Sequence, residues 1–303
     1  MPGPGLGSRT GSKVVRETAN VTVLVIGAAG PLGGDVARGL VAEGVSVRAM
    51  TRRAAAVVPD GVAGVVRADL ADPGSLAAAC ADVERVFLVS SPTQEQVVLE
   101  TNAITAAERA GVARIVKISN LPIAGLDTGL HGNHRAIEAR LAQSPIDATV
   151  LQPSFFASVL ARQLPLLRTG RLVFPIGSGR IAWIDPRDIA AVAVAVLASD
   201  APPAGPLRLT GPAALTAAEV AARIAAVAGH EIELVQPPLD QWQQRLIKSG
   251  MDPWLVASTV HLYEAVARDA LADVSPDVER VLRRPPRPLD DWLRDALVPL
   301  LAE

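Results

Sequence analysis

Cysteine is nearly missing from this sequence, which has 303 residues and a single cysteine, Cys80. One cysteine excludes a disulfide within the chain and argues against a metal site built from thiolates, as expected for a protein of a reducing cytoplasm. Histidine does not compensate, because His131 and His134 are spaced closely but have no third or fourth ligand nearby in the sequence. We therefore expect no metal site.

An excess of charge of one sign and a long apolar run are missing too. The net charge is −2, and the basic residues are scattered, which argues against a nucleic-acid or membrane-surface partner. The longest apolar run, residues 189–198, is about half of the roughly 20 residues that a membrane span needs, so it predicts a buried helix. Residues 1–20 have no apolar core of signal-peptide length and are expected to be a flexible tail. These absences predict a soluble, cytoplasmic protein.

The first half of the sequence shows a regular alternation of two patterns. Helical segments at residues 31–43, 94–110 and 131–143 separate short runs rich in Val and Ile, which begin at Val21, Val45, Val62, Val83, Ala113 and Ile146. Near-continuous apolar strands alternating with helices are typical of a parallel sheet covered on both faces. Six such strands predict an α/β fold with a Rossmann-type, doubly wound sheet that binds a nucleotide.

The second half has a different pattern, with clustered prolines and three of the four tryptophans beyond residue 240. Thr216 and Glu219 form a capping-box sequence, and Gly229 is a helix stop. We expect a smaller, mostly helical C-terminal substrate lobe. The predicted division is a tail of 1–20, a Rossmann domain of 21–152 with about 186–210, and a lobe of 153–185 and 211–303.

Three glycines, Gly27, Gly30 and Gly33, lie between the first predicted strand and the first predicted helix. In that context Gly27 permits a sharp turn, Gly30 lets the backbone approach a pyrophosphate, and Gly33 lets the helix pack close to the sheet. An ordinary glycine-rich turn is the alternative. The motif therefore predicts a dinucleotide site.

The end of the second predicted strand indicates which dinucleotide binds. Sheets that bind NAD usually carry a carboxylate there for the ribose hydroxyls. Here Arg52 and Arg53 occupy the place, and guanidinium groups pair with phosphate. Both features favour NADP(H) through its 2′-phosphate, although the two arginines would also be ordinary as solvated loop residues.

The motifs GAAGPLG, RAMTRR, RADLADPGSL, VERVFLVSSP, HRAIEARL, PSFF, IDPRDIAAVAVAVL and LTGPAALTAAEVA occur in this order from Val21 to about Trp292. In this order they resemble the NmrA-like, atypical short-chain dehydrogenase/reductases. The resemblance implies that Asp69 and Leu70 flank the adenine, that residues 89–92 pass the nicotinamide ribose, and that residues 153–156 lie near the nicotinamide. The expected cofactor-binding residues are Gly27, Ala29, Gly30, Pro31, Leu32, Gly33, Arg52, Arg53, Asp69, Leu70, Val89, Ser90, Ser91, Ser119, His134, Pro153, Phe155 and Phe156.

The usual proton donor of the wider superfamily is missing. Ordinary members use a tyrosine and a lysine four residues later, and the resemblance places Leu130 and His134 at those positions, while the one tyrosine is Tyr263. His134 and Glu138 share a helix face, and His134 is a candidate to bond the nicotinamide ribose or to act as a proton source with a pKa near neutrality. The alternative is an ordinary surface histidine.

Ser119 is the second candidate catalytic residue, because it matches the place of the superfamily's catalytic serine and could polarise an acceptor oxygen. Serines at strand ends also commonly form turns. Core packing is the safer reading for at least one of Phe155 and Phe156, and also for Trp183. Asp188 is expected to cap the helix that follows it.

These features predict an NADPH-dependent oxidoreductase that transfers hydride to a small, apolar, aromatic or quinone-like acceptor. Such acceptors need no protein proton donor, which fits the missing tyrosine. Two alternatives stay open: a regulatory protein that senses NADP(H) without catalysis, and a redox-neutral cyclase or isomerase on the same fold. The sequence does not distinguish a monomer from a homodimer.

Overall fold

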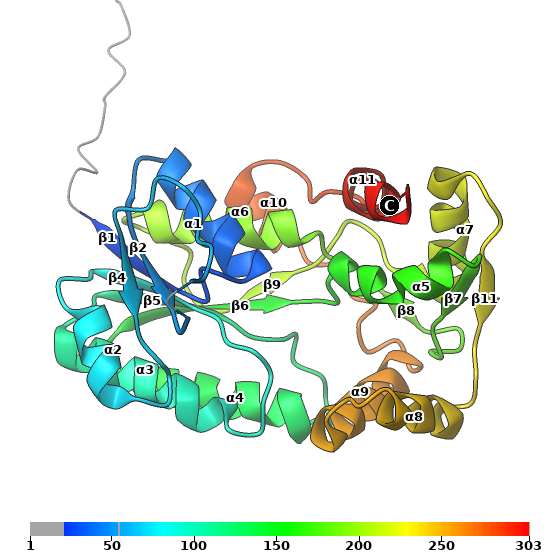
Figure 1. The fold of residues 1–303 in the computed structure, drawn as a ribbon, viewed down its shortest axis with the longest axis horizontal. Coiled ribbons are helices and arrows are strands. Elements are labelled where there is room, and N and C mark those ends of the chain that lie inside the picture. The colour runs from blue at the N-terminus through cyan, green and yellow to red at the C-terminus, as the bar shows by residue number, and fades with distance from the viewer. Residues whose placement is uncertain (1–20, 54, 303) are drawn as a thin grey trace, which may run out of the picture.

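The computed structural model describes residues 21–53 and 55–302, so the tail expected at 1–20 lies outside the described residues. Its centre is a seven-stranded sheet in the order β3-β2-β1-β4-β5-β6-β9, in which every neighbouring pair is parallel (Figure 1). This order is doubly wound, with β1 at the point where the chain changes direction. The strands are β1 Thr22–Ile26, β2 Ser46–Thr51, β3 Gly64–Arg67, β4 Arg85–Leu88, β5 Arg114–Ile118, β6 Asp147–Pro153 and β9 Leu207–Leu209.

The six strands expected from the sequence are therefore present, and β9 is an addition. It pairs with β6 in register from Leu151 with Leu207 to Pro153 with Leu209. Three residues after a proline-rich stretch are too few to show a pattern in the sequence.

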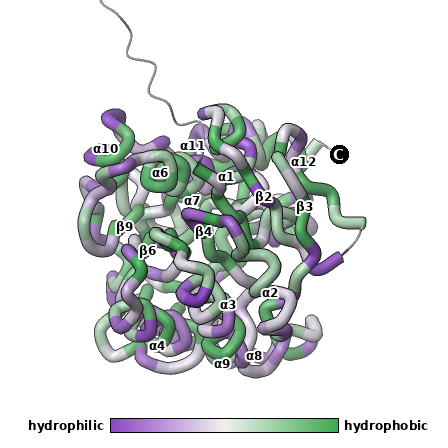
Figure 2. Tube along the Cα trace, turned by 90° about the vertical axis from the view of Figure 1, so that its left-hand side faces the viewer, coloured by the Kyte–Doolittle hydropathy of each residue, from purple (hydrophilic) through white to green (hydrophobic). Residues whose placement is uncertain are grey.

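Helices cover both faces of the sheet. On one face lie α1 Pro31–Ala42, α6 Pro186–Ala198 and α10 Asp277–Leu282, and on the other α2 Pro73–Cys80, α3 Gln96–Ala110 and α4 Gly129–Ala142 (Figure 1). Alternate residues of β1 supply the two cores, with Val23 and Val25 on the α1 face and Leu24 and Ile26 on the α3 face. The run at 189–198 is indeed a largely buried helix, and the tube at the α6 label is mostly green, that is hydrophobic, in Figure 2.

The N-terminus of α6 corrects one expectation. Its cap is Asp185, whose side chain accepts a hydrogen bond from the Arg187 amide, and Pro186 follows in the first turn. Asp188 is fully buried within the first turn of the helix and binds arginines from the C-terminal segment instead.

The C-terminal lobe has its own hydrophobic cluster, separate from the two that flank the sheet. Its helix α7 begins with the predicted capping box of Thr216 and Glu219 and ends at Gly229. Two small sheets pair β10 with β8 and β11 with β7. The remaining elements are η1 Ala157–Gln163, α5 Leu164–Leu167, β7 Arg171–Val173, β8 Arg180–Ile181, β10 Leu215–Thr216, α7 Ala217–Ala228, β11 Glu233–Val235, α8 Leu239–Lys248, α9 Pro253–Val266, α11 Leu289–Trp292, η2 Leu293–Leu297 and α12 Val298–Ala302.

Across residues 21–53 and 55–302, the structure contains no helix with the length and apolar character that crossing a bilayer requires.

Candidate functional site

The turn between β1 and α1 is built on glycines that leave no room for side chains. Gly27 has φ +82°, and a Cβ on it would lie 2.8 Å from Val89 Cγ1. A Cβ on Gly33 would lie 2.2 Å from the Gly27 carbonyl oxygen, so α1 packs directly on the turn. Gly30 is the N-cap and offers no capping side chain, which leaves the first amides of α1 available to an anion.

A first cavity of about 610 Å³ opens around this turn. It is formed by the start of α1 and by the segments that follow β2, β3 and β4. Of the expected cofactor-binding residues, it brings together Gly27, Ala29, Gly30, Pro31, Leu32, Gly33, Arg52, Arg53, Asp69, Leu70, Val89, Ser90 and Ser91.

The cationic end of this cavity carries two exposed arginines, Arg52 and Arg53. Within the described part of the chain neither guanidinium forms an ion pair. The backbone oxygen of Arg52 accepts a hydrogen bond from Arg67 Nε at 3.3 Å. The Asp69 carboxylate is used locally, since it accepts from the Ala71 amide at 2.9 Å. Both guanidiniums are therefore available to a phosphate.

A second cavity of about 730 Å³ adjoins the first and shares Pro31, Leu32, Val89 and Ser90 with it. It contains three more of the expected residues, Ser119, His134 and Phe156, together with Leu130 at the vacated tyrosine position. Its remaining lining residues are Asp35, Pro92, Gln96, Ile118, Asn120, Ser158, Arg162, Pro186, Arg187, Trp292, Asp295 and Ala296.

Two of the expected cofactor-binding residues are placed elsewhere. Phe155 packs in the core of the C-terminal lobe, with its ring 5.2 Å from Trp183 and 6.0 Å from Phe174 between centroids. Pro153 is buried at the end of β6, where it pairs with Leu209. Consecutive residues of an extended segment point to opposite sides, so Phe156 faces the cavity while Phe155 faces the core.

Tyr263, the one tyrosine, belongs to the same lobe core as Phe155 and lines neither cavity. Burial raises the pKa of its hydroxyl, which makes it still less suited to proton transfer. No group of three or more His, Cys, Asp or Glu residues in the described chain is placed to hold a metal ion.

Ser119 follows β5 and is almost fully buried. Its hydroxyl donates to Glu138 Oε1, and Gln152 Nε2 donates to both oxygens of the same carboxylate at 3.3 and 3.2 Å. A serine hydroxyl has one proton to donate. In this arrangement the proton is used in the bond to Glu138, which would have to break before Ser119 could donate to an acceptor oxygen.

His134 lies on α4 and is 7% exposed. Burial lowers the pKa of its imidazole to about 2, with further lowering from the charges of Lys117 and His131. The expected pKa near neutrality is therefore wrong, because the ring is not solvated. At neutral pH His134 is an uncharged imidazole, able to hydrogen-bond but not to serve as an imidazolium acid.

A buried ion pair that was not expected from the sequence lies behind this histidine. Lys117 of β5 and Glu100 of α3 are both fully buried, and Nζ lies 2.7 Å from Glu100 Oε2 and 3.3 Å from His134 Nδ1. The signal was present in the run RIVKIS, since a lysine inside a strand that is covered on both faces needs a buried partner.

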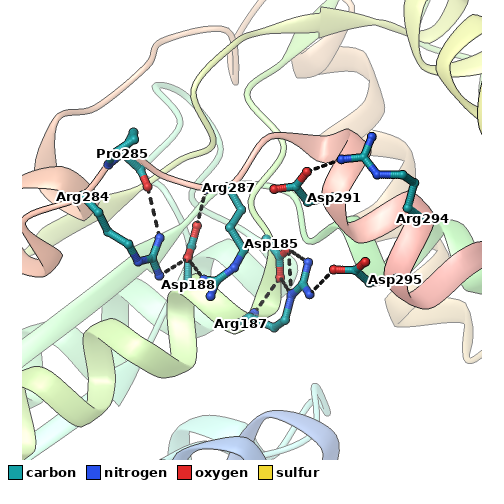
Figure 3. Close-up of polar contacts among 9 residues, drawn as sticks. All are labelled: Asp185, Arg187, Asp188, Arg284, Pro285, Arg287, Asp291, Arg294 and Asp295. Carbon is teal, nitrogen blue, oxygen red and sulfur yellow. Dashed lines mark hydrogen bonds and ion pairs between the residues drawn. The ribbon is translucent and has the colours of Figure 1, made fainter.

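The C-terminal segment forms one wall of the second cavity, and Figure 3 shows how it is attached. Arg187 at the start of α6 pairs with the Asp185 cap at 2.6 Å and with Asp295 of η2 at 2.6 Å. The buried Asp188 accepts from Arg284 at 2.7 Å and from the amide and guanidinium of Arg287. These bonds hold the segment of Trp292 to Ala296 against the sheet domain.

Comparison with known proteins gives a consistent result. The model of the NmrA-like family matches residues 19–293. An NAD(P)H azoreductase of Xenophilus azovorans is 34% identical, with 90% of this chain and 96% of the relative covered. A (4-alkanoyl-5-oxo-2,5-dihydrofuran-3-yl)methyl phosphate reductase of Streptomyces griseus is 30% identical, with 89% and 96% covered. The structure of an NADPH-dependent quinone oxidoreductase of Escherichia coli, complexed with NADPH, aligns with a TM-score of 0.78 and 25% identity, covering 90% of this chain and 98% of that one.

Proposed function

The chain belongs to the NmrA-like family, and on that premise we propose that it transfers hydride from NADPH to a small, apolar, aromatic or quinone-like acceptor in the second cavity. It is an oxidoreductase, and its cofactor is NADP(H). The observation that carries the choice of acceptor is a cavity that continues from the dinucleotide turn and has Leu130 where the superfamily has its tyrosine.

The described residues fit the cofactor. The turn would be filled by a side chain on Gly27 or Gly33, and the uncapped start of α1 suits a pyrophosphate. Arg52 and Arg53 suit the 2′-phosphate, and His134 suits a ribose hydroxyl as an uncharged hydrogen-bond partner. When bound, NADP(H) supplies the hydride from its nicotinamide ring.

The chemistry of the second cavity favours acceptors that take up an electron pair without an acid. A ketone develops an alkoxide that needs a proton donor, but Leu130 has none, Ser119 donates to Glu138, and His134 is uncharged. A quinone, a cationic dye or an activated double bond delocalises the charge, and the solvent can protonate it afterwards. Apolar groups such as Ile118, Phe156 and Trp292 provide the surface that holds such an acceptor.

The test is a panel of acceptors assayed by the loss of NADPH absorbance. Quinones and cationic dyes are expected to be reduced faster than unactivated ketones at equal concentration, and His134→Ala is expected to slow the reaction by roughly three- to tenfold, the value of one neutral hydrogen bond. Brisk reduction of ketones would contradict the role given to Leu130. Tight NADPH binding with no turnover of any acceptor would favour the NADP(H)-sensing protein or the redox-neutral enzyme.

Two further assignments belong to this proposal. We propose that residues 21–152 with about 186–210 form the cofactor-binding domain, and that 153–185 and 211–303 form the substrate lobe. The separate hydrophobic clusters on the sheet and in the lobe support this division except at α10, whose Val278 packs in a cluster of the sheet. A cytoplasmic location is supported by the one cysteine, Cys80, which is free and buried.

A further inference from the structure

Three polar residues on the wall of the second cavity contact a single buried ion pair. Glu100 Oε1 accepts hydrogen bonds from Ser90 Oγ at 2.7 Å and from Gln96 Nε2 at 3.1 Å. Its other oxygen contacts Lys117 Nζ at 2.7 Å. Ser90, Gln96 and His134 all line the cavity, and each of them also contacts one member of the ion pair.

The contacts of Lys117 determine which nitrogen of His134 carries the proton. Its Nζ is close to Glu100 Oε2 at 2.7 Å, to the Ile118 carbonyl oxygen at 2.6 Å and to His134 Nδ1 at 3.3 Å. Burial lowers the pKa of Lys117, while the Glu100 carboxylate opposes this and favours the ammonium form, which has three N–H donors and no acceptor. Nδ1 must therefore accept, and an uncharged imidazole that accepts at Nδ1 carries its proton on Nε2.

From these contacts we propose that Lys117 is a positioning residue for His134. Glu100 fixes Lys117, and Lys117 in turn holds His134 uncharged, with Nε2–H as the donor for an oxygen atom bound in the second cavity. This inference rests on the proposed function for the identity of that oxygen, either a ribose hydroxyl of the cofactor or a carbonyl oxygen of the acceptor. It assigns a role to a lysine that does not line the cavity itself.

The charges around His134 agree with this role. Lys117 approaches from β5 with Glu100 of α3 behind it, and His131 and Glu138 lie on the same helix as His134. Glu138 is engaged by Ser119 and Gln152. A proton on Nδ1 would point at the ammonium group of Lys117, so that two donors face each other. Protonation of the ring is therefore unfavourable, because it brings two positive charges together and removes the acceptor at Nδ1.

The first test needs no substitution in the protein that is measured. The chain has four histidines, so selective ¹⁵N-histidine labelling and correlation through the carbon-bound ring protons can resolve each ring, with His134→Gln identifying its signal. We expect His134 to show the Nε2-protonated form and no titration between about pH 5 and 8. An Nδ1-protonated ring, or titration within that range, would overturn the proposal.

The second test removes the ion pair as a unit. The double variant Lys117→Met/Glu100→Gln avoids leaving a single buried charge. The His134 ring of this variant is expected to show the Nδ1-protonated form beside the Nε2-protonated one, because Nδ1 no longer faces an ammonium group. The value of kcat/KM for a quinone should fall by roughly three- to tenfold. A loss in NADPH affinity would assign the oxygen to the ribose, and a loss in kcat alone would assign it to the acceptor.

The matched control removes an ion pair that also involves helix α3 but joins it to α4. Glu108 of α3 and Arg140 of α4 lie 2.6 Å apart and touch neither cavity. The variant Glu108→Gln/Arg140→Met should leave the His134 signals and kcat/KM unchanged. An unaltered His134 spectrum in the Lys117 variant, or an equal change in both variants, would contradict the positioning role. Failure of every acceptor to react would contradict the proposed function, while the spectra would still decide the state of His134.

Discussion

Acid should destabilise this protein over an unusually high pH range, because two histidines are buried without charge. Burial is the main cause that lowers the pKa of His131 to about 4 and that of His134 to about 2, from an ordinary value of 6.5. At any pH between 6.5 and the pKa of a ring in the folded protein, that ring binds a proton in the unfolded chain but not in the folded chain. The stability contributed by the uncharged rings is therefore complete above about pH 6.5 and is lost as the pH falls below it.

The size of the loss follows from the two pKa values. Each unit of pH below 6.5 costs about 1.4 kcal/mol per histidine until the pKa in the folded state is reached. At pH 5 each ring has lost about 2 kcal/mol, and His131 and His134 together about 4 kcal/mol, a large part of the about 5–15 kcal/mol by which a domain is stable.

Urea unfolding at pH 7.5 and pH 5 measures this difference directly. We expect His131→Gln and His134→Gln each to shrink the difference by about 2 kcal/mol. Replacement of the surface residue His230 by Gln serves as the control and should not reduce it. If the double variant showed the same loss between the two pH values as the wild type, the uncharged, buried state of these rings would be refuted.

Three further predictions concern the two cavities. Arg52→Ala should weaken NADPH binding by roughly ten- to hundredfold and leave NADH binding nearly unchanged, since a charge-assisted contact is worth about 1.5–3 kcal/mol. Calorimetric titrations with the two cofactors measure this, and equal losses of affinity for both would contradict the 2′-phosphate role. Gly33→Ala places a Cβ 2.2 Å from the Gly27 oxygen, so it should cost about 1–3 kcal/mol in urea unfolding and weaken NADPH binding; an unchanged midpoint would contradict the tight packing. Arg162 is exposed on the wall of the second cavity and forms no ion pair in the described chain, so it should favour anionic acceptors. The variant Arg162→Gln should raise the KM of anionic acceptors severalfold relative to that of uncharged quinones. An equal effect on the KM of both kinds of acceptor would contradict this role.

The sequence predicted the sheet well, because strands buried on both faces leave long apolar runs that few other structures produce. It missed β9, whose three residues carry no pattern, and it assigned the helix cap to Asp188 when Asp185 stands directly before Pro186. A proline in the first turn was the better guide to the start of the helix. The role of Asp188 depends on Arg284 and Arg287, almost 100 residues away, and no local pattern contains that information.

In the candidate site, too, some features could be predicted from the sequence and others could not. The glycine turn and Arg52 could be expected beside one cavity from their spacing, because each lies directly after a strand of the sheet. His134 was expected at the site and lines the second cavity, but its pKa was misjudged, since burial and the charge of Lys117 come from other elements. Phe155 and Phe156 could not be told apart, because the direction of an extended segment decides which of them faces the cavity.

The wall built by Trp292 to Ala296 also sets an order of events during synthesis on the ribosome. The sheet is complete at Leu209, whereas this wall emerges roughly 80 residues later, about 4 to 16 s at ordinary rates of translation. The dinucleotide turn and its arginines are therefore available to fold before the acceptor cavity is enclosed. Under the proposed function, a nascent chain could bind NADP(H) before the second cavity has its C-terminal wall.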